Sequence, residues 1–161
     1  MAEFHFVTTW KIEAPLPQVF GAITQCLTWP AWWKGVEKVE ELDPGNADGI
    51  GSLRRFIWKG MLPYRLNFLI RIVRAEPLKI IEGQASGDVE GVGCWHFSHD
   101  TPITTVRYEW HVRTTRLWMN LLLPVVKPLV RWNHDQLMKQ GGEGLARLLN
   151  ARLACMTHGH L

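Results

Sequence analysis

The sequence predicts an α+β fold in which a curved antiparallel sheet wraps around a long C-terminal helix. From residue 36 onward, six extended segments follow one another, separated by turns rich in glycine, proline, asparagine and aspartate. After Pro124 and Pro128, apolar residues recur at helical spacing. Helices that are segregated from an antiparallel sheet define the α+β class. With one further strand before these six, the expected sheet has seven strands.

The first strand is expected over residues 3–13, where side chains alternate between two faces. The row that should face the core consists of Phe4, Phe6, Thr8, Trp10 and Ile12. Two prolines, Pro15 and Pro17, end this strand and begin a short helix. Thr28 is a suitable N-cap for a second short helix over residues 29–34. Two short helices should therefore separate the first strand from the other six.

The central strands show the period of two most clearly in two places. One row consists of Tyr64, Leu66, Phe68, Ile70 and Ile72, and the other of Val106, Tyr108, Trp110 and Val112. Because alternate residues of a strand share a face, these rows should form one wall of the interior.

The last helix is expected to begin near the two prolines and to place an apolar stripe against the sheet. Its members are Leu129, Trp132, Leu137, Leu145, Leu148 and Leu149. The Gly141-Gly142 pair should weaken or bend this helix, because glycine has a low helix propensity. Trp132 is thus expected to face the sheet.

Length, charge and cysteine content exclude several classes of protein. The 161 residues suit one domain, so we expect residues 1–161 to form a single ligand-binding unit. The net charge of +3 is scattered rather than clustered, which argues against nucleic acid as a partner. Three cysteines without metal-type spacing suggest neither a zinc site nor a disulfide framework, and favour the cytoplasm. No metal and no cofactor are expected.

Nine tryptophans in a chain of this length indicate that something large is filled or lined by aromatic rings. The rows assigned to the concave face of the sheet, together with the last helix, supply the candidate ligand-binding residues. These are Trp10, Phe68, Trp95, Phe97, Tyr108, Trp110 and Trp132. Their rings could stack on a flat or isoprenoid ligand, or they could simply pack the core. The mouth of a half-barrel that grips one helix is a common ligand site.

Several stretches occur in an order that is typical of one superfamily. They are Ile12-Glu13-Ala14-Pro15 with Val19-Phe20, Gly49-Ile50-Gly51-Ser52, residues 85–97 and residues 105–110. With them the whole chain resembles the START-like, or helix-grip, superfamily, which includes the major birch pollen allergen and lipid-transfer START domains. It is most similar to the bacterial polyketide cyclase/dehydrase-type branch. The resemblance implies a cavity for a hydrophobic ligand more directly than it implies a reaction.

Polar residues offer fewer candidates for chemistry. Arg54 and Arg55 lie on opposite faces of one strand, so one of them could point inward and orient a carboxylate or carbonyl group. Asn133 and His134 accompany Trp132 near the expected start of the last helix, where satisfying backbone donors is the simpler role. His96 and His111 fall on the outer phase of their strands and are expected at the surface. The catalytic residues, if any, remain unknown from the sequence.

The segment from Leu117 to Val130 is more apolar than a surface connection requires. It is interrupted by Pro124, Lys127 and Pro128, which excludes a membrane span. Three alternatives remain open: a lid over the cavity, a patch that touches a membrane, or a buried helical turn.

The sequence therefore favours a binder of a hydrophobic small molecule, such as a lipid, an isoprenoid or a polycyclic polyketide-like compound, acting as carrier or sensor. The alternative is an enzyme of the polyketide cyclase or aromatase type that uses the same cavity. A third hypothesis is a chaperone-like or membrane-associated protein that docks through Leu117 to Val130.

Overall fold

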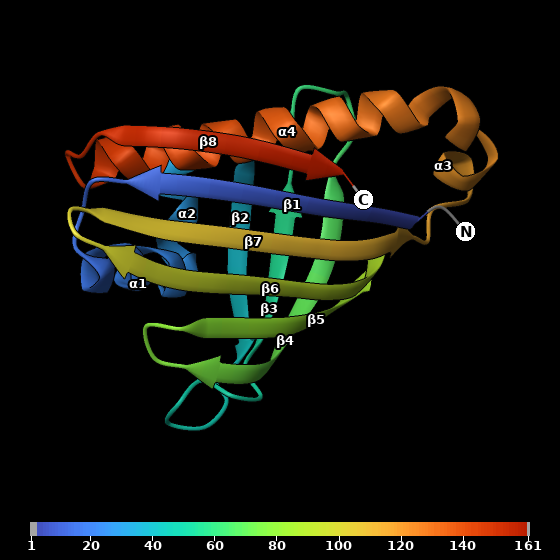
Figure 1. The fold of residues 1–161 in the computed structure, drawn as a ribbon. Coiled ribbons are helices and arrows are strands. Elements are labelled where there is room, and N and C mark those ends of the chain that lie inside the picture. The colour runs from blue at the N-terminus through green and yellow to red at the C-terminus, as the bar shows by residue number, and fades with distance from the viewer. Residues whose placement is uncertain (1–2, 161) are drawn as a thin grey trace.

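The computed structural model describes residues 3–160 and contains one strongly curved, eight-stranded antiparallel sheet (Figure 1). The strands follow the order β2-β3-β4-β5-β6-β7-β1-β8. Their bounds are Glu3–Ile12 (β1), Val36–Asp43 (β2), Leu53–Trp58 (β3), Leu66–Glu76 (β4), Ile80–Gly87 (β5), Val89–Asp100 (β6), Ile103–Thr114 (β7) and Leu153–His160 (β8). The meander β2 to β7 confirms the six consecutive strands expected from the sequence.

The expected count of seven strands is wrong by one, because the chain after the last helix adds β8 to the free edge of β1. β8 runs antiparallel to β1 and places Met156 opposite Trp10. Leu153–His160 contains glycine, two histidines and few β-branched residues, so its local pattern carries little strand signal. Backbone hydrogen bonds to β1 stabilise the extended conformation of this segment, which its residue types do not favour by themselves.

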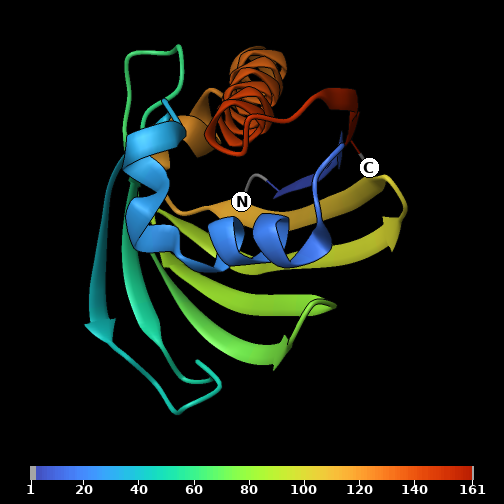
Figure 2. The same ribbon diagram turned by 90° about the vertical axis from the view of Figure 1, so that its left-hand side faces the viewer.

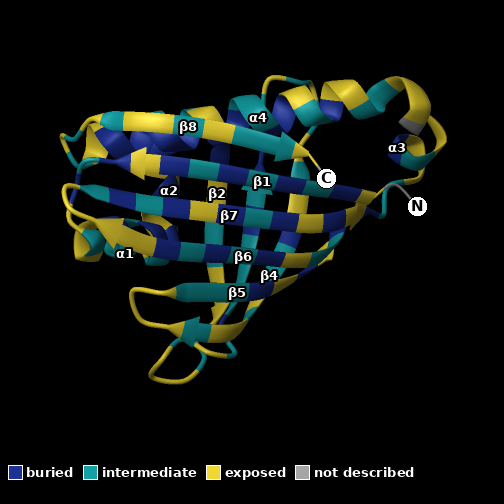
Figure 3. Ribbon diagram, in the orientation of Figure 1, coloured by how far each residue is buried: buried dark blue, intermediate teal, exposed yellow. Residues whose placement is uncertain are grey.

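The alternation predicted for β1 is confirmed. Phe4, Phe6, Thr8, Trp10 and Ile12 are all buried. The opposite phase faces outward, where His5 stacks on His111 of β7 with ring centroids 4.8 Å apart. β1 therefore presents an apolar face to the interior, and Figure 3 shows the alternation of burial along this strand.

The short helices lie on the concave side of the sheet (Figure 2). They are α1 (Leu16–Thr24), the 3₁₀ turn η1 (Cys26–Thr28) and α2 (Trp29–Trp32). α1 buries Val19 and Ile23, and the Trp29 indole N–H donates to the Ile23 carbonyl oxygen at 3.1 Å. This bond ties the start of α2 to the end of α1, so the two helices form one cover over the sheet.

The long helix α4 (Leu123–Leu148) follows the short α3 (Leu117–Leu121) and runs along the interior of the curved sheet (Figure 2). The predicted apolar stripe is partly wrong. Leu137 and Leu145 are buried, but Leu129 and Trp132 are exposed by 49% and 44%. The buried stripe passes instead through Val130 and Met138, because Val130 is the chain neighbour of Leu129 and adjacent residues of a helix point to different faces.

The glycines of α4 act as contact points for the tryptophans rather than as a break in the helix. A Cβ atom on Gly142 would lie 2.9 Å from the Trp10 Nε1 atom, and one on Gly141 would collide with the Trp33 ring. The Trp33 indole N–H in turn donates to the Leu137 carbonyl oxygen at 2.8 Å. The missing side chains let α4 approach the tryptophan layer closely, and the helix continues through both positions without interruption.

Candidate functional site

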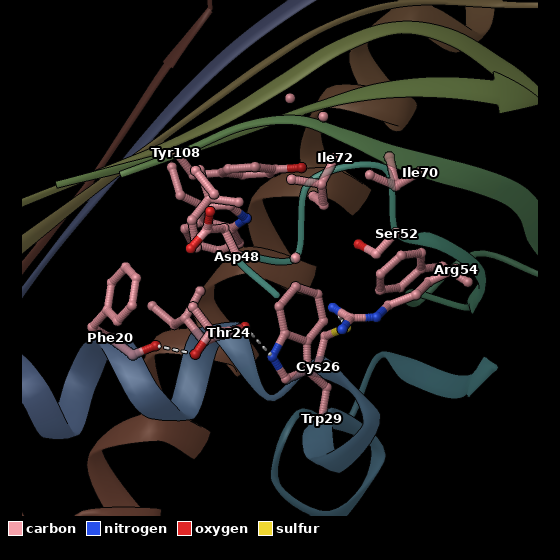
Figure 4. Close-up of a pocket in the computed structure, with 18 of the residues that line it drawn as sticks. Phe20, Thr24, Cys26, Trp29, Asp48, Ser52, Arg54, Ile70, Ile72 and Tyr108 are labelled. Carbon is pink, nitrogen blue, oxygen red and sulfur yellow. Dashed lines mark hydrogen bonds between the residues drawn. The ribbon is translucent and has the colours of Figure 1, made fainter. Parts of the chain in front are cut away.

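A cavity of about 390 Å³ lies between the concave face of the sheet and the α1–α2 cover (Figure 4). Its wall is formed by α1, η1, α2, the 47–49 loop and strands β3 to β7. The wall is mostly apolar, with Phe20, Ile23, Trp29, Phe56, Ile70 and Ile72 among its members. This volume lies within the range of small-molecule sites.

Three of the seven aromatic residues expected to bind ligand line this cavity: Phe68, Trp95 and Tyr108. Tyr108 stacks on Trp95 with ring centroids 4.0 Å apart and an interplanar angle of 24°. Burial, together with the nearby Cys94 thiol, raises the pKa of Tyr108 well above its ordinary value. The phenol therefore remains protonated and can act as a hydrogen-bond donor.

The other four aromatic residues lie elsewhere. Trp10 is fully buried and packs between Trp33 and Trp95, with centroids 5.5 Å and 5.7 Å away. Phe97 packs edge-on against Phe20 at 4.9 Å. Neither residue lines the cavity. Trp110 lines a second, smaller cavity, and Trp132 is exposed on the outer side of α4.

Arg54 is the cation of the cavity, and Arg55 is not in its wall. Arg54 shares its phase on β3 with the buried Phe56 and Trp58, which places its guanidinium inside. One Nη atom donates to the Cys26 Sγ atom at 3.0 Å, and the other lies 3.4 Å from a Glu41 carboxylate oxygen. The structure thus resolves the alternative left open by the sequence in favour of Arg54.

The Cys26 thiol is held by this contact rather than activated by it. Burial raises the pKa of Cys26, and the charge of Arg54 offsets this only in part. Because the thiolate is the reactive form, a buried thiol with a raised pKa is a poor nucleophile. Cys26 is therefore part of the cavity wall and a partner that orients Arg54.

Two buried donors of β3 have no hydrogen-bond partner among residues 3–160: the Arg54 Nε–H group and the Trp58 Nε1–H group. Both residues line the large cavity. A buried donor without a partner is costly, so such groups in a pocket wall favour a ligand that carries an acceptor oxygen. Thr24, Asp48, Ser52 and Tyr108 add further polar groups to the wall, and Figure 4 shows them around the cavity.

Sequence reasoning missed most of the wall that α1, η1 and β3 contribute. Trp29, Cys26 and Ser52 were not candidates, because no pattern along the chain indicates that a short helix covers a cavity. Trp58 could have been found, since it shares the two-residue period of Arg54 and Phe56 on one strand.

The smaller cavity, of about 50 Å³, lies between α4 and the sheet and borders Trp58 and Phe68 from the other side. Asn133 and His134 line it. The Asn133 Oδ1 atom accepts from the Leu62 N–H group at 3.1 Å, and its amide donates to the Tyr64 hydroxyl at 3.1 Å. The expected role at the helix start is wrong, since α4 begins ten residues earlier and Asn133 instead anchors the 60–64 loop.

His134 is buried against Phe6, with ring centroids 3.8 Å apart and planes 9° from parallel. Burial lowers the pKa of His134, and Asp135 opposes this effect only partly. The imidazole is therefore neutral at neutral pH. Among the described residues, no group of three or more His, Cys, Asp or Glu side chains is arranged to hold a metal ion.

The amino-acid sequence matches the model of one known family. The family model described as polyketide cyclase / dehydrase and lipid transport matches residues 3–154. The chain belongs to this family. Membership confirms the resemblance inferred from the sequence, and the family description covers polyketide cyclases or dehydrases and lipid transport. A comparison with curated proteins gives no match.

Solved structures support the assignment of the fold. A protein of Thermus thermophilus is 20% identical, with a TM-score of 0.71 over 89% of this chain and 98% of that one. A START superfamily protein of Mycobacterium smegmatis is 14% identical, with a TM-score of 0.72 over 91% of this chain and 97% of that one. The Zhui aromatase/cyclase of a Streptomyces species is 17% identical, with a TM-score of 0.61 over 91% and 96%. At these identities the similarity establishes the helix-grip fold alone.

Proposed function

We propose that residues 1–161 act as one domain that binds an apolar small molecule with a carboxylate or carbonyl oxygen at one end, as a carrier or sensor. The observation that carries this proposal is the pair of buried, unpartnered donors of Arg54 and Trp58 in a largely apolar cavity. The apolar wall supplies affinity by burying the body of the ligand. The donors select which end of the ligand enters and reject ligands that lack an acceptor.

Charge favours an acidic group over a neutral one at this end. The Arg54 guanidinium lines the cavity, contacts Cys26 and lies 3.4 Å from its nearest carboxylate, that of Glu41, so its positive charge favours a carboxylate in this cavity. A charge-assisted hydrogen bond of this kind is worth about 1.5–3 kcal/mol. That is sufficient for roughly tenfold or greater discrimination between an acid and an alcohol of the same chain length.

The test compares three ligands with one apolar body: a fatty acid of about ten carbons, the matching alcohol and the matching alkane. We expect the acid to bind most tightly in titration calorimetry. Arg54→Met should remove this preference, because the donor is lost while the apolar volume is kept.

Arg55→Met is the matched control, because Arg55 neighbours Arg54 but pairs with Glu40 outside the cavity at 3.5 Å. The control should bind like the unchanged protein. Equal affinity for all three ligands, or equal effects of the two substitutions, would refute the proposal.

A second candidate function is cyclisation of a polyketide-like chain, favoured by the protonated Tyr108 and by Arg54 in one cavity. In such a step an activated CH₂ group loses a proton, its carbon bonds to a carbonyl carbon of the same chain, and the carbonyl oxygen gains a proton. Arg54 and Tyr108 would donate hydrogen bonds to that oxygen. A short poly-β-ketone thioester that cyclises at the same rate with and without the protein would remove this candidate.

A cytoplasmic location is the expectation that accompanies both candidates. Cys26, Cys94 and Cys155 are free thiols, and free thiols persist in reducing compartments. Fractionation of cells that express the full chain tests this expectation directly.

A further inference from the structure

A second surface of the molecule is apolar although it faces solvent. It covers the outer side of α3 and of the first half of α4, where Figure 3 shows exposed residues. Its large side chains are exposed by 41% to 75%. We name it the apolar patch and define it as Leu117, Trp118, Leu121, Leu122, Val125, Leu129 and Trp132.

The patch is a helical stripe and not a scatter of single residues. Val125, Leu129 and Trp132 are spaced by four and three residues, so they share one face of α4. The buried residues Val130 and Leu137 occupy the opposite face. The first half of α4 is thus apolar on two sides, whereas a surface helix needs only one. A contiguous exposed stripe of this kind indicates a contact surface.

Charge around the patch distinguishes between possible partners. Residues 114–134 contain Arg116, Lys127 and Arg131 and no aspartate or glutamate. Lys127 and Arg131 lie on α4 itself, and the Lys127 Nζ atom is 5.8 Å from the Phe4 ring centroid. Arg116 pairs with Asp88 at 2.7 Å. An apolar stripe flanked by cations, with tryptophans among its members, complements a bilayer that carries anionic headgroups.

We infer that the apolar patch docks this protein on an anionic bilayer surface, with α3 and α4 lying in the plane of the interface. Leucine and tryptophan side chains would enter the headgroup region while Lys127 and Arg131 meet lipid phosphates. The contact is peripheral, because no helix within residues 3–160 is long and apolar enough to cross a membrane.

Docking would leave the ligand cavity accessible. Figure 2 shows α4 and the loop between β2 and β3 at opposite ends of the molecule, and that loop supplies part of the cavity wall. None of the seven patch residues lines the large cavity. The sequence left open whether Leu117 to Val130 forms a lid over the cavity; the patch residues do not line the large cavity as such a lid would. The inference about the membrane does not depend on the proposed ligand.

The test is co-sedimentation of the full chain with vesicles of phosphatidylcholine alone or with roughly one quarter phosphatidylglycerol. We expect binding to the anionic vesicles, and its loss at about 1 M salt, where the screening length is about 3 Å. The double variant Val125→Gln/Leu129→Gln should lower partitioning about tenfold or more, because two inserted apolar side chains are lost. Lys127→Gln/Arg131→Gln should weaken binding to anionic vesicles only.

The matched control is Leu42→Gln/Val73→Gln, which removes two exposed apolar side chains from β2 and β4. It should bind vesicles like the unchanged protein, and circular dichroism should show that all variants fold. Absence of vesicle binding, or equal losses in patch and control variants, would overturn the inference. Equal binding to neutral and anionic vesicles would also overturn it. So would a dimer in sedimentation velocity that the patch variant abolishes and the control variant keeps, because the patch would then bind a second copy of the chain.

Discussion

His134 illustrates at the scale of one residue how a position in the fold sets a charge. It lies in the middle of α4, stacked on Phe6, and its ring nitrogens are buried without a hydrogen-bond partner among the described residues. Asp135, His158 and His160 face the same region, and the His160 Nε2 atom lies 3.0 Å from an Asp135 carboxylate oxygen. Burial alone would raise the pKa of Asp135, but the nearby His134 ring and the hydrogen bond with His160 lower it overall.

We therefore predict that the free energy of unfolding falls as the pH drops below about 6.5, the pKa of an unfolded histidine. The folded chain holds the pKa of His134 below that value through burial, so the unfolded chain binds a proton first. Stability is then present above this pH and is lost below it, with a slope of at most about 1.4 kcal/mol per pH unit for one such proton. Urea titrations between pH 7 and pH 5 measure the slope.

The matched variant is His134→Phe, which keeps a planar ring against Phe6 and removes the titrating group. Its stability should depend less steeply on pH than that of the unchanged chain. Some pH dependence of the stability should remain in this variant, because burial also lowers the pKa of His158. Identical slopes for the two proteins would show that His134 does not titrate as its surroundings require.

Residue-scale prediction from the sequence succeeded where periodicity carries the information. The alternation on β3 limited the inward arginine to Arg54 or Arg55, and the alternation on β1 identified the buried row correctly. It failed for Trp132, which is apolar and at helical spacing but exposed. A helix that is apolar on two sides gives no signal for which side meets the sheet, because both sides satisfy the same periodicity.

At the scale of elements, the glycines of α4 decide how closely the helix meets the tryptophans. A Cβ atom on Gly144 would collide with the Trp32 carbonyl oxygen, which belongs to the backbone and cannot rotate away. Gly144→Ala should therefore destabilise the fold by about 1–3 kcal/mol, although alanine is the better helix former. Chemical denaturation measures the change.

Gly21→Ala on α1 is the matched control, because a Cβ atom there meets nothing within 4 Å. It should leave stability unchanged or raise it by up to about 1 kcal/mol through helix propensity. The idea that close approach explains the glycines fails if both substitutions stabilise the protein.

The elements themselves were predictable to different degrees. Six consecutive strands followed from turn residues at regular intervals, and the two short helices from prolines beside apolar residues. β8 was not predictable, because Leu153–His160 becomes a strand through the free edge of β1 and not through its own propensity. The start of α4 at Leu123 agrees with the entry expected at Pro124 and Pro128. Pro128 lies inside the helix, where it cannot donate the backbone hydrogen bond of an ordinary helical residue.

At the scale of the molecule, the interior is divided into two chambers that the sequence could not foresee. Trp58 and Phe68 line both the large and the small cavity, so they form the partition between them. Aromatic residues along a chain indicate a lined interior, but the space that remains depends on how eight strands, four α-helices and one 3₁₀ turn fill it. The sequence therefore predicted a cavity through its resemblance to a family, and not its walls.

The separation of cavity and patch leads to a last prediction about the whole molecule. Arg54 and the patch residues Val125 and Leu129 have no common cavity, and Figure 2 places the cavity loop and α4 at opposite ends. Substitutions at distant sites without shared partners usually act independently. Arg54→Met should thus remove the preference for an acidic ligand without changing vesicle partitioning, and Val125→Gln/Leu129→Gln should do the reverse.

Both variants are measured in both assays, by calorimetry with the acid and alcohol pair and by co-sedimentation with anionic vesicles. Two independent losses would mean that the membrane holds the protein while the cavity faces the aqueous side and exchanges ligand there. If instead the patch variant also loses ligand affinity, the first half of α4 must transmit bilayer contact to the cavity. The partition formed by Trp58 and Phe68 is the element through which it would do so, because Phe68 lines the large cavity and shares the smaller one with Val130 of α4.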